Sequence, residues 1–325
     1  MDALSEVLRV VKLDAAIFFN AEFSSPWCFY SPASPQVAPM LSPGASRVVV
    51  YHLLTDGEAY IRLEDGPPIA LRAGDIVTCP HGDPHYLGHG PEARPIDGHT
   101  ALPGLLAQGL ALVRAGGGGP RAHLICGFLA CEPQLCETFL AGLPPIVKIN
   151  IRDDTSGQWL ENSLRFSVAE AATAHAGAEA MLAKLSEVVF VETLRRYVRD
   201  LPPERTGWLA GARDPVVGRA LTLLHRQPAA PWTIAGLAQE VGTSRSVLAE
   251  RFRTLLGEPP IAYLTNWRLR LGAQALATTS RSVGEIADEV GYESEASFNR
   301  AFKRLFGQPP ARYRQAERER RATVR

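Results

Sequence analysis

Two segments near the carboxyl-terminal end of the chain repeat one another. Residues 237–242 read LAQEVG and residues 286–291 read IADEVG, an offset of 49. After one inserted residue the match continues at an offset of 50, where residues 244–263 and 294–313 share serine, phenylalanine, leucine, glycine, two prolines and tyrosine. A match of this length is not chance, and an internal repeat constrains the fold more strongly than a single motif does. This part of the chain is therefore built from two copies of one structural unit.

Each copy has the pattern of a short helix, a glycine turn and a second helix. In the second copy, Ser282 and Glu285 have the spacing of a capping box, and Gly291 permits the left-handed conformation that ends a helix. Phe298 and Phe302 are four residues apart and predict the buried face of the next helix. Its outward residues are polar and partly basic, which is typical of a helix-turn-helix. A helical bundle with solvent-exposed charges is the alternative for either copy alone.

The segment between the copies and the distribution of charge both favour DNA as the partner. Residues 261–277 predict a helix of about 15 residues, ~22 Å long, which can hold two recognition helices ~34 Å apart, one turn of DNA. Residues 215–325 contain 17 Lys and Arg against 10 Asp and Glu, a net charge of +7, whereas residues 1–214 have a net charge of −7. A basic third of a neutral chain fits a polyanionic partner.

Residues 220–314 resemble the AraC/XylS family of transcriptional regulators, above all in the motif IADEVGYESEASFNRAFKRLFGQP from Ile286 to Pro309. The resemblance implies base contacts from the outward faces of both second helices. With the basic residues that face outward beside them, the DNA-binding candidates are Arg245, Ser246, Ala249, Glu250 and Arg253 in the first copy, and Glu295, Ala296, Asn299, Arg300, Lys303 and Arg304 in the second.

Side-chain chemistry separates the roles of these candidates. Arg300 can read guanine, Asn299 can read adenine, and Glu250 or Glu295 can accept from the amino group of cytosine. The first recognition helix is poor in strong donors, so the second is expected to carry much of the specificity. The candidates for phosphate contacts are Arg268, Arg270, Lys303, Arg304, Arg312 and Arg314.

The amino-terminal part predicts β-structure. Short β-rich runs separated by turn residues indicate a sandwich or barrel, at residues 47–54, 58–63, 68–72, 75–80 and 122–130. Residues 74–85, GDIVTCPHGDPH, fit G-x5-P-x-G-x2-H and resemble the second motif of a cupin barrel. The first motif is weaker, because a single His52 stands where an enzymatic cupin has paired histidines. Residues 1–200 thus resemble a cupin-type sensor domain, with FSSPWCFYSP (residues 23–32) expected before the first strand.

Imidazoles near one mouth of the expected barrel form a candidate site for a divalent metal or an effector. The candidate ligands are His52, His81 and His85, with Cys28 or Cys79. The alternative is that His85 and Asp83 hold the hairpin by hydrogen bonds, and that His52 lines an effector pocket without metal.

Residues 158–199 change to a spacing of three and four between apolar residues, which predicts two amphipathic helices. These helices either dimerise the protein or cover an open side of the barrel, and they couple the barrel to the DNA-binding domain. Residues 201–214 break the pattern and predict a linker.

The predicted fold class is α+β with two domains. A cupin-like barrel with flanking helices occupies residues 1–200, and an all-α domain with two helix-turn-helix units occupies residues 215–318, followed by a tail at residues 319–325. The predicted function is sequence-specific regulation of transcription under control of a small molecule, without enzymatic activity. The alternative is a metal-dependent cupin enzyme with a helical appendage.

The expected partners are double-stranded promoter DNA, a small-molecule effector, RNA polymerase where the protein is an activator, and a second copy of the chain, but not a membrane. Asp2 and Glu6 stand where a signal peptide needs positive charge. Five cysteines, an odd number, fit reduced thiols in a cytoplasm. The expected location is therefore cytoplasmic.

Overall fold

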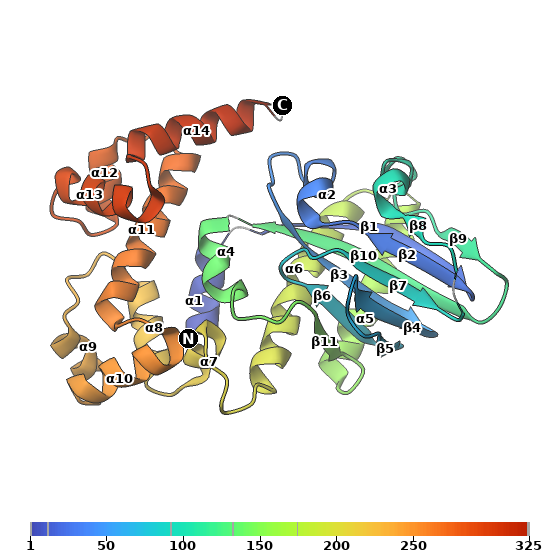
Figure 1. Cartoon of the computed structure of the whole chain (residues 1–325), viewed down its shortest axis with the longest axis horizontal. Coiled ribbons are helices and arrows are strands. Elements are labelled where there is room, and N and C mark those ends of the chain that lie inside the picture. The colour runs from blue at the N-terminus through green and yellow to red at the C-terminus, as the bar shows by residue number, and fades with distance from the viewer. Residues whose placement is uncertain (1, 12, 92, 132, 174, 324–325) are drawn as a thin grey trace. The chain divides into compact units, whose positions relative to one another are not determined.

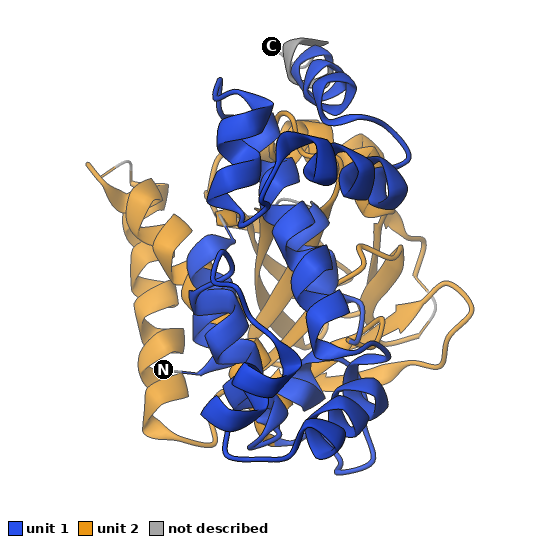
Figure 2. Cartoon of the chain, turned by 90° about the vertical axis from the view of Figure 1, so that its left-hand side faces the viewer, with its two compact units in different colours: residues 1–12, 132–142, 200–325 blue, residues 13–131, 143–199 orange. Residues whose placement is uncertain are grey.

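The computed structural model describes residues 2–11, 13–91, 93–131, 133–173 and 175–323. The chain divides into two compact units, which Figure 2 shows in different colours. The sheet unit comprises residues 13–131 and 143–199, and the helical unit comprises residues 1–12, 132–142 and 200–325. A single boundary at residue 200 therefore does not separate the two units completely, because residues 1–12 and 132–142 also belong to the helical unit.

The strands of the sheet unit form two sheets with the core between them (Figure 1). One sheet has the order β11-β6-β3-β10-β1-β9 and the other has the order β5-β4-β7-β2-β8. Phe19 and Leu124 of the first sheet share one buried cluster with Ile61 and Leu87 of the second. The strands are β1 (Leu13–Ser24), β2 (Trp27–Ser31), β3 (Val48–Asp56), β4 (Glu58–Leu63), β5 (Ile69–Arg72), β6 (Asp75–Cys79), β7 (His85–His89), β8 (Ile96–Asp97), β9 (Val113–Gly116), β10 (Arg121–Cys131) and β11 (Val147–Asn150). The cupin-like fold is confirmed, with two open sheets among the described residues in place of a closed ring.

The five predicted β-runs are confirmed as β3, β4, β5, β6 and β10. The expectation that FSSPWCFYSP precedes the first strand is wrong, since residues 23–24 end β1 and residues 27–31 form β2. β1 pairs along its whole length with β10, and a register shift between Ile17 and Phe19 interrupts the alternation of its side chains. This irregularity hides the period of two by which a strand is identified in a sequence.

The two predicted amphipathic helices are α5 (Thr155–Ala172) and α6 (Ala178–Arg199). They pack on one another, and α6 covers the outer face of the six-stranded sheet at β1, β10 and β11. The buried Tyr51 hydroxyl of β3 makes a hydrogen bond of 2.7 Å with the Ser186 hydroxyl of α6. Covering the sheet is therefore one function of these helices. The shorter helices of this unit are α2 (Ser34–Leu41) and α3 (Gly98–Ala107).

The helical unit contains both copies of the repeat, joined by α11 (Figure 1). α11 has 19 residues, longer than expected, and spans ~28 Å at 1.5 Å per residue. The amino-terminal helix packs on α8, and α4 packs on α11, which explains why these segments belong to this unit. Its helices are α1 (Ala3–Val10), α4 (Pro133–Leu140), α7 (Trp208–Arg213), α8 (Val217–Arg226), α9 (Ile234–Glu240), α10 (Arg245–Leu256), α11 (Pro260–Thr278), α12 (Val283–Glu289), α13 (Glu295–Phe306) and α14 (Pro310–Thr323).

The predicted linker at residues 201–214 is partly wrong, because its second half is the helix α7. Trp208 of this helix is 4 % exposed, and its indole N–H donates to the Tyr263 hydroxyl at 2.7 Å. The Tyr263 hydroxyl also pairs with His225 Nε2 at 2.6 Å. Burial lowers the pKa of His225 to about 3, so this imidazole is neutral. The second half of the predicted linker therefore packs into the core of the helical unit.

Two further expectations concern cysteines and membranes. Cys28, Cys79 and Cys126 are free thiols, but Cys136 is disulfide-bonded, so the prediction of reduced thiols throughout is wrong for that residue. In the part of the chain that the structure describes, every helix is too short or too polar to cross a bilayer.

Candidate nucleic-acid interface and sheet-unit cavity

The second helix of each repeat copy begins at a capping serine. The Ser244 hydroxyl accepts from the Val247 amide in α10, and the Ser294 hydroxyl accepts from the Ser297 amide in α13, at 3.2 and 3.3 Å. Both parts of the predicted capping box at the start of α12 are present. Gly291 has φ +87° and a Cβ there would lie 2.7 Å from the backbone of Ala229, so glycine is required on two grounds.

The inward faces of these helices form the core of the helical unit. Leu248 and Phe252 of α10, and Phe298 and Phe302 of α13, are fully buried. Phe298 makes edge contacts with Tyr292 and lies against α11 where Gly272 leaves room for its ring. Burial of one face leaves the opposite face of each helix pointing to solvent.

The outward faces carry the predicted DNA-binding residues. Ala249 and Asn299 are half-buried, and the remaining nine are exposed: Arg245, Ser246, Glu250, Arg253, Glu295, Ala296, Arg300, Lys303 and Arg304. Within the described residues, none of the five cations in this set forms an ion pair with a carboxylate. Their charges are therefore available to a polyanion.

Two of the candidates for phosphate contacts also bond inside the helical unit. Arg268 donates to three backbone carbonyl groups of its own unit at 2.6 to 3.1 Å, and burial lowers the pKa of its guanidinium. Arg270 donates to the Gln134 carbonyl at 2.8 Å and to the Thr138 hydroxyl at 2.9 Å. These arginines hold helices and loops together through part of their hydrogen-bonding capacity.

A cavity lies between the two sheets of the sheet unit. Its wall contains Phe19 and Phe23 of β1, Phe29 of β2, Leu124 of β10 and Leu102 of α3. Of the candidate site residues in the amino-terminal part of the chain, His52 is the one that lines this cavity, although the dense aromatic residues between positions 18 and 29 are visible in the sequence.

A chain of hydrogen bonds that begins at the cavity wall joins two buried histidines. His85 Nδ1 donates to the Asp83 carbonyl at 2.9 Å, because a carbonyl oxygen only accepts. Burial lowers the pKa of both imidazoles, so both are neutral. His85 Nε2 therefore accepts from His52 Nε2–H at 2.8 Å, and His52 Nδ1 accepts the Cys126 thiol proton at 2.8 Å. Every nitrogen of the two rings takes part in a hydrogen bond within the protein. This agrees with the alternative interpretation, in which the histidines act without a metal.

The five candidate metal ligands do not form one site. His81 Nε2 pairs with the Leu143 carbonyl at 2.9 Å, and Cys28 lies by the Tyr60 hydroxyl. Burial raises the pKa of Cys79 to about 12, so its thiol stays protonated. In the described residues no three His, Cys, Asp or Glu side chains are placed to hold one ion. Among the described residues, the five candidate ligands therefore do not assemble into one metal site.

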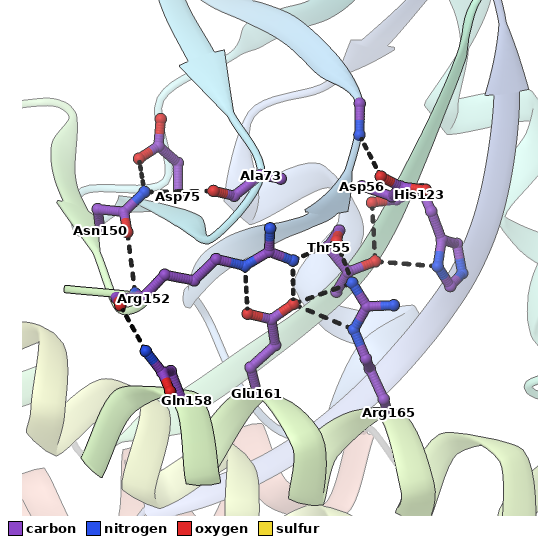
Figure 3. A network of polar contacts seen from close by, with 11 residues as sticks. Thr55, Asp56, Ala73, Asp75, His123, Asn150, Arg152, Gln158, Glu161 and Arg165 are labelled. Carbon is purple, nitrogen blue, oxygen red and sulfur yellow. Dashed lines mark hydrogen bonds and ion pairs between the residues drawn. The ribbon is translucent and has the colours of Figure 1, made fainter. Parts of the chain in front are cut away.

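A polar network that the sequence analysis missed ties α5 to the sheet (Figure 3). Glu161 accepts four hydrogen bonds from Arg152 and Arg165, at 2.6 to 3.0 Å. Both guanidinium groups also donate to the Thr55 carbonyl oxygen at the end of β3. The Thr55 hydroxyl pairs with His123 Nδ1 of β10 at 2.9 Å. No motif marks this network, because it joins residues that are far apart in the sequence.

The network lies on the face of the six-stranded sheet opposite to the cavity. Side chains alternate along a strand, and Leu124, the neighbour of His123, lines the cavity. On β1, Asn20 pairs with His123 Nε2 at 2.8 Å, whereas its neighbour Phe19 lines the cavity. The same strands thus bear the cavity wall on one face and the network on the other.

The outer faces of α5 and α6 expose large apolar side chains. Trp159 and Phe166 are seven residues apart on α5 and are 61 % and 65 % exposed. Met181 and Val188 repeat this spacing on α6 and are also exposed. Residues seven apart share a helix face, so each helix carries an apolar stripe that the described residues leave uncovered.

Comparison with known proteins covers both units. The family model described as cupin matches residues 2–199, and the model described as helix-turn-helix domain matches residues 237–316. An AraC-like transcription regulator of Streptomyces lividans is 32% identical over 97% of this chain and 98% of its own. The RCS-specific transcriptional activator RclR of Escherichia coli K12 is 28% identical over 98% of this chain and 99% of its own.

Among solved structures, the DNA-binding domain of AdpA in complex with a target DNA is 30% identical to this chain. It aligns with a TM-score of 0.32 and covers 34% of this chain and 97% of its own. The two family models give an amino-terminal cupin domain followed by a helix-turn-helix domain, and the Streptomyces lividans relative aligns along almost the whole chain. The chain belongs to the AraC-like family of transcription regulators.

Proposed function

We propose that the regulator reads promoter DNA with the outward faces of α10 and α13, and that a small molecule bound by the sheet unit changes this binding. The observation that supports the proposal is the pair of capped repeat helices, each of which exposes cations that no carboxylate neutralises among the described residues. The regulator acts in the cytoplasm, with RNA polymerase as the further partner at an activated promoter. We assign no catalytic step to the sheet unit, because its buried imidazoles bond to one another and to Cys126.

Specific reading is expected to depend most on α13. Arg300→Ala should reduce the preference for the regulator's own upstream DNA over scrambled DNA by about 1–3 kcal/mol, since a bidentate arginine–guanine contact contributes that much discrimination. Fluorescence anisotropy with both DNAs measures the preference.

Arg114→Ala is the matched control for that experiment. It removes one positive charge from an exposed arginine of the sheet unit and should leave the preference unchanged. Equal preference in wild type and Arg300→Ala would show that the base contacts lie elsewhere.

The coupling between the units is proposed to begin in the six-stranded sheet. A ligand that widens the cavity displaces β1, β3 or β10, and those strands hold α5 through Thr55, His123 and the two arginines. Because Glu161 holds both arginines, a shift of the sheet is transmitted to α5 rather than absorbed by a loose side chain.

A second copy of the chain is proposed to cover the apolar stripes of α5 and α6. The double variant Trp159→Ser, Phe166→Ser should weaken self-association at least about tenfold, because two large side chains would no longer be buried. Sedimentation velocity over a concentration series measures it. Leu112→Ser, which alters another exposed apolar residue of the same unit, is the control. A wild type that sediments as a monomer with and without DNA would remove the dimer from the proposal.

A further inference from the structure

The cavity of the sheet unit has a wall without charged side chains. It is lined by sixteen residues from β1, β2, β3, β7, β10, α2 and α3 and the segments beside them. Most contribute phenylalanine, tryptophan, leucine or valine side chains, and the polar ones are Ser31, His52 and Cys126. Ligand pockets in proteins are mostly apolar with a few convergent polar groups, and this wall has that composition.

The cavity is narrow for its extent. The space among the lining residues, with its opening, is about 540 Å³, but only about 30 Å³ of it is wide enough for the centre of a water molecule. The rings of Phe23 and Trp27 stack at a centroid distance of 4.4 Å, and Phe19 lies against Phe29 at 5.8 Å. These rings are in contact with one another and form part of the wall, so the narrow space that they line admits only a thin molecule, such as an extended hydrocarbon chain or a single aromatic ring.

The polar groups on the wall cannot neutralise an anion. Both nitrogens of His52 are engaged, one with His85 and the other with the Cys126 thiol. Protonating this ring would place a charge in a buried apolar setting beside a second imidazole, which is unfavourable. The Ser31 hydroxyl is the remaining polar side-chain group and can donate or accept one hydrogen bond.

We propose that this cavity binds a thin, uncharged apolar molecule with at most one hydrogen-bonding group, that is, a long-chain or aromatic alcohol, aldehyde or ketone. The proposal rests on the proposed function only in taking this ligand as the effector. A carboxylate of the same chain length is excluded. Its charged group would lose its hydration in the cavity, and the wall has no cationic side chain to form an ion pair with it.

Octan-1-ol and octanoate provide a matched pair of probes with the same eight-carbon skeleton. Isothermal titration of the full-length protein at neutral pH should show saturable binding of octan-1-ol with one site per chain. Octanoate should bind at least about tenfold more weakly, since burying an unpaired charge is costly. Octanoate binding as tightly as the alcohol, or no binding of either probe, would overturn the proposal.

A gain-of-function variant locates the binding in this cavity. Leu41 of α2 lines the cavity and is half-buried, so a lysine there can keep its ammonium near solvent and meet a carboxylate at the opening. Leu41→Lys should therefore strengthen octanoate binding relative to octan-1-ol by about tenfold or more. Gln36→Lys places the same charge on an exposed position of α2 outside the lining and should not change the ratio. An unchanged ratio in Leu41→Lys would place the ligand elsewhere and overturn the proposal.

The same titrations, repeated with DNA present, separate this proposal from the proposed function. Binding of octan-1-ol that leaves DNA affinity unchanged would confirm the ligand class of the cavity and contradict effector control. Intact DNA reading by a protein that prefers octanoate would confirm the regulator's DNA-binding mode and contradict the ligand class.

Discussion

Phe298→Ala is expected to lower the free energy of unfolding of the helical unit by about 3–5 kcal/mol. The ring is fully buried in α13 and belongs to the cluster formed by α11, α12 and α13. It packs against Phe302 at a centroid distance of 5.4 Å, and α11 leaves room for it at Gly272. Alanine would leave a cavity in a tightly packed aromatic cluster, since its neighbours cannot collapse fully into the space. Denaturant unfolding followed by far-UV circular dichroism measures the loss.

Leu305→Ala is the matched control on the same helix. Leu305 is 40 % exposed, so its truncation should change the free energy of unfolding by less than about 0.5 kcal/mol. Phe252→Ala removes the equivalent ring of the first copy and should cost as much as Phe298→Ala, because both rings are fully buried. A Phe298→Ala protein within about 1 kcal/mol of wild type would contradict the packing described for the repeat.

Glu161→Gln is expected to lower the free energy of unfolding of the sheet unit by about 2–3 kcal/mol at neutral pH. The loss is less than the 3–5 kcal/mol typical of a broken buried pair, because Arg152 and Arg165 remain partly exposed to water. The substitution keeps the shape of the side chain, but it removes the charge and turns an amide N–H group toward the guanidinium donors.

The effect of Glu161→Gln should disappear in acid. Burial raises the pKa of Glu161, but hydrogen bonds from Arg152 and Arg165 outweigh it and hold the pKa below its ordinary value of 4.5. A carboxyl group with a lowered pKa stabilises the fold above its unfolded pKa, and this contribution is lost as the pH falls through the folded value. The difference between wild type and variant should therefore shrink below pH 4.5. Glu179→Gln, at an exposed position of α6, is the control, and a pH-independent difference would contradict the role of the network.

The helix-turn-helix units were predictable because their signals are local. Ser282, Glu285 and Ser294 cap helices within one turn of themselves, and Gly291 marks a conformation that few other residues adopt. The spacing of Phe298 from Phe302 defines the buried face without reference to any distant residue. The outward residues then follow from helix geometry, and the structure exposes most of them.

The parts that the sequence did not reveal depend on contacts between distant segments. β1 lies between β10 and β9, but its register shift disrupts the alternation that would identify it. The segments of α1 and α4 join the helical unit through packing on α8 and α11, which no local pattern records. Arg268 and Arg270 are further examples. Their place in the sequence does not indicate that their guanidinium groups donate to backbone carbonyl oxygens of distant segments.

The most direct test of the account is the binding of the wild-type protein to the DNA upstream of its own gene and to a scrambled sequence at two salt concentrations. Fluorescence anisotropy should show tighter binding to the upstream DNA, and both affinities should fall as salt rises, since exposed cations on α10 and α13 displace counterions from phosphates. Equal, salt-independent affinity for both sequences, or no binding to either, would contradict the assignment of the repeat as the DNA-reading surface.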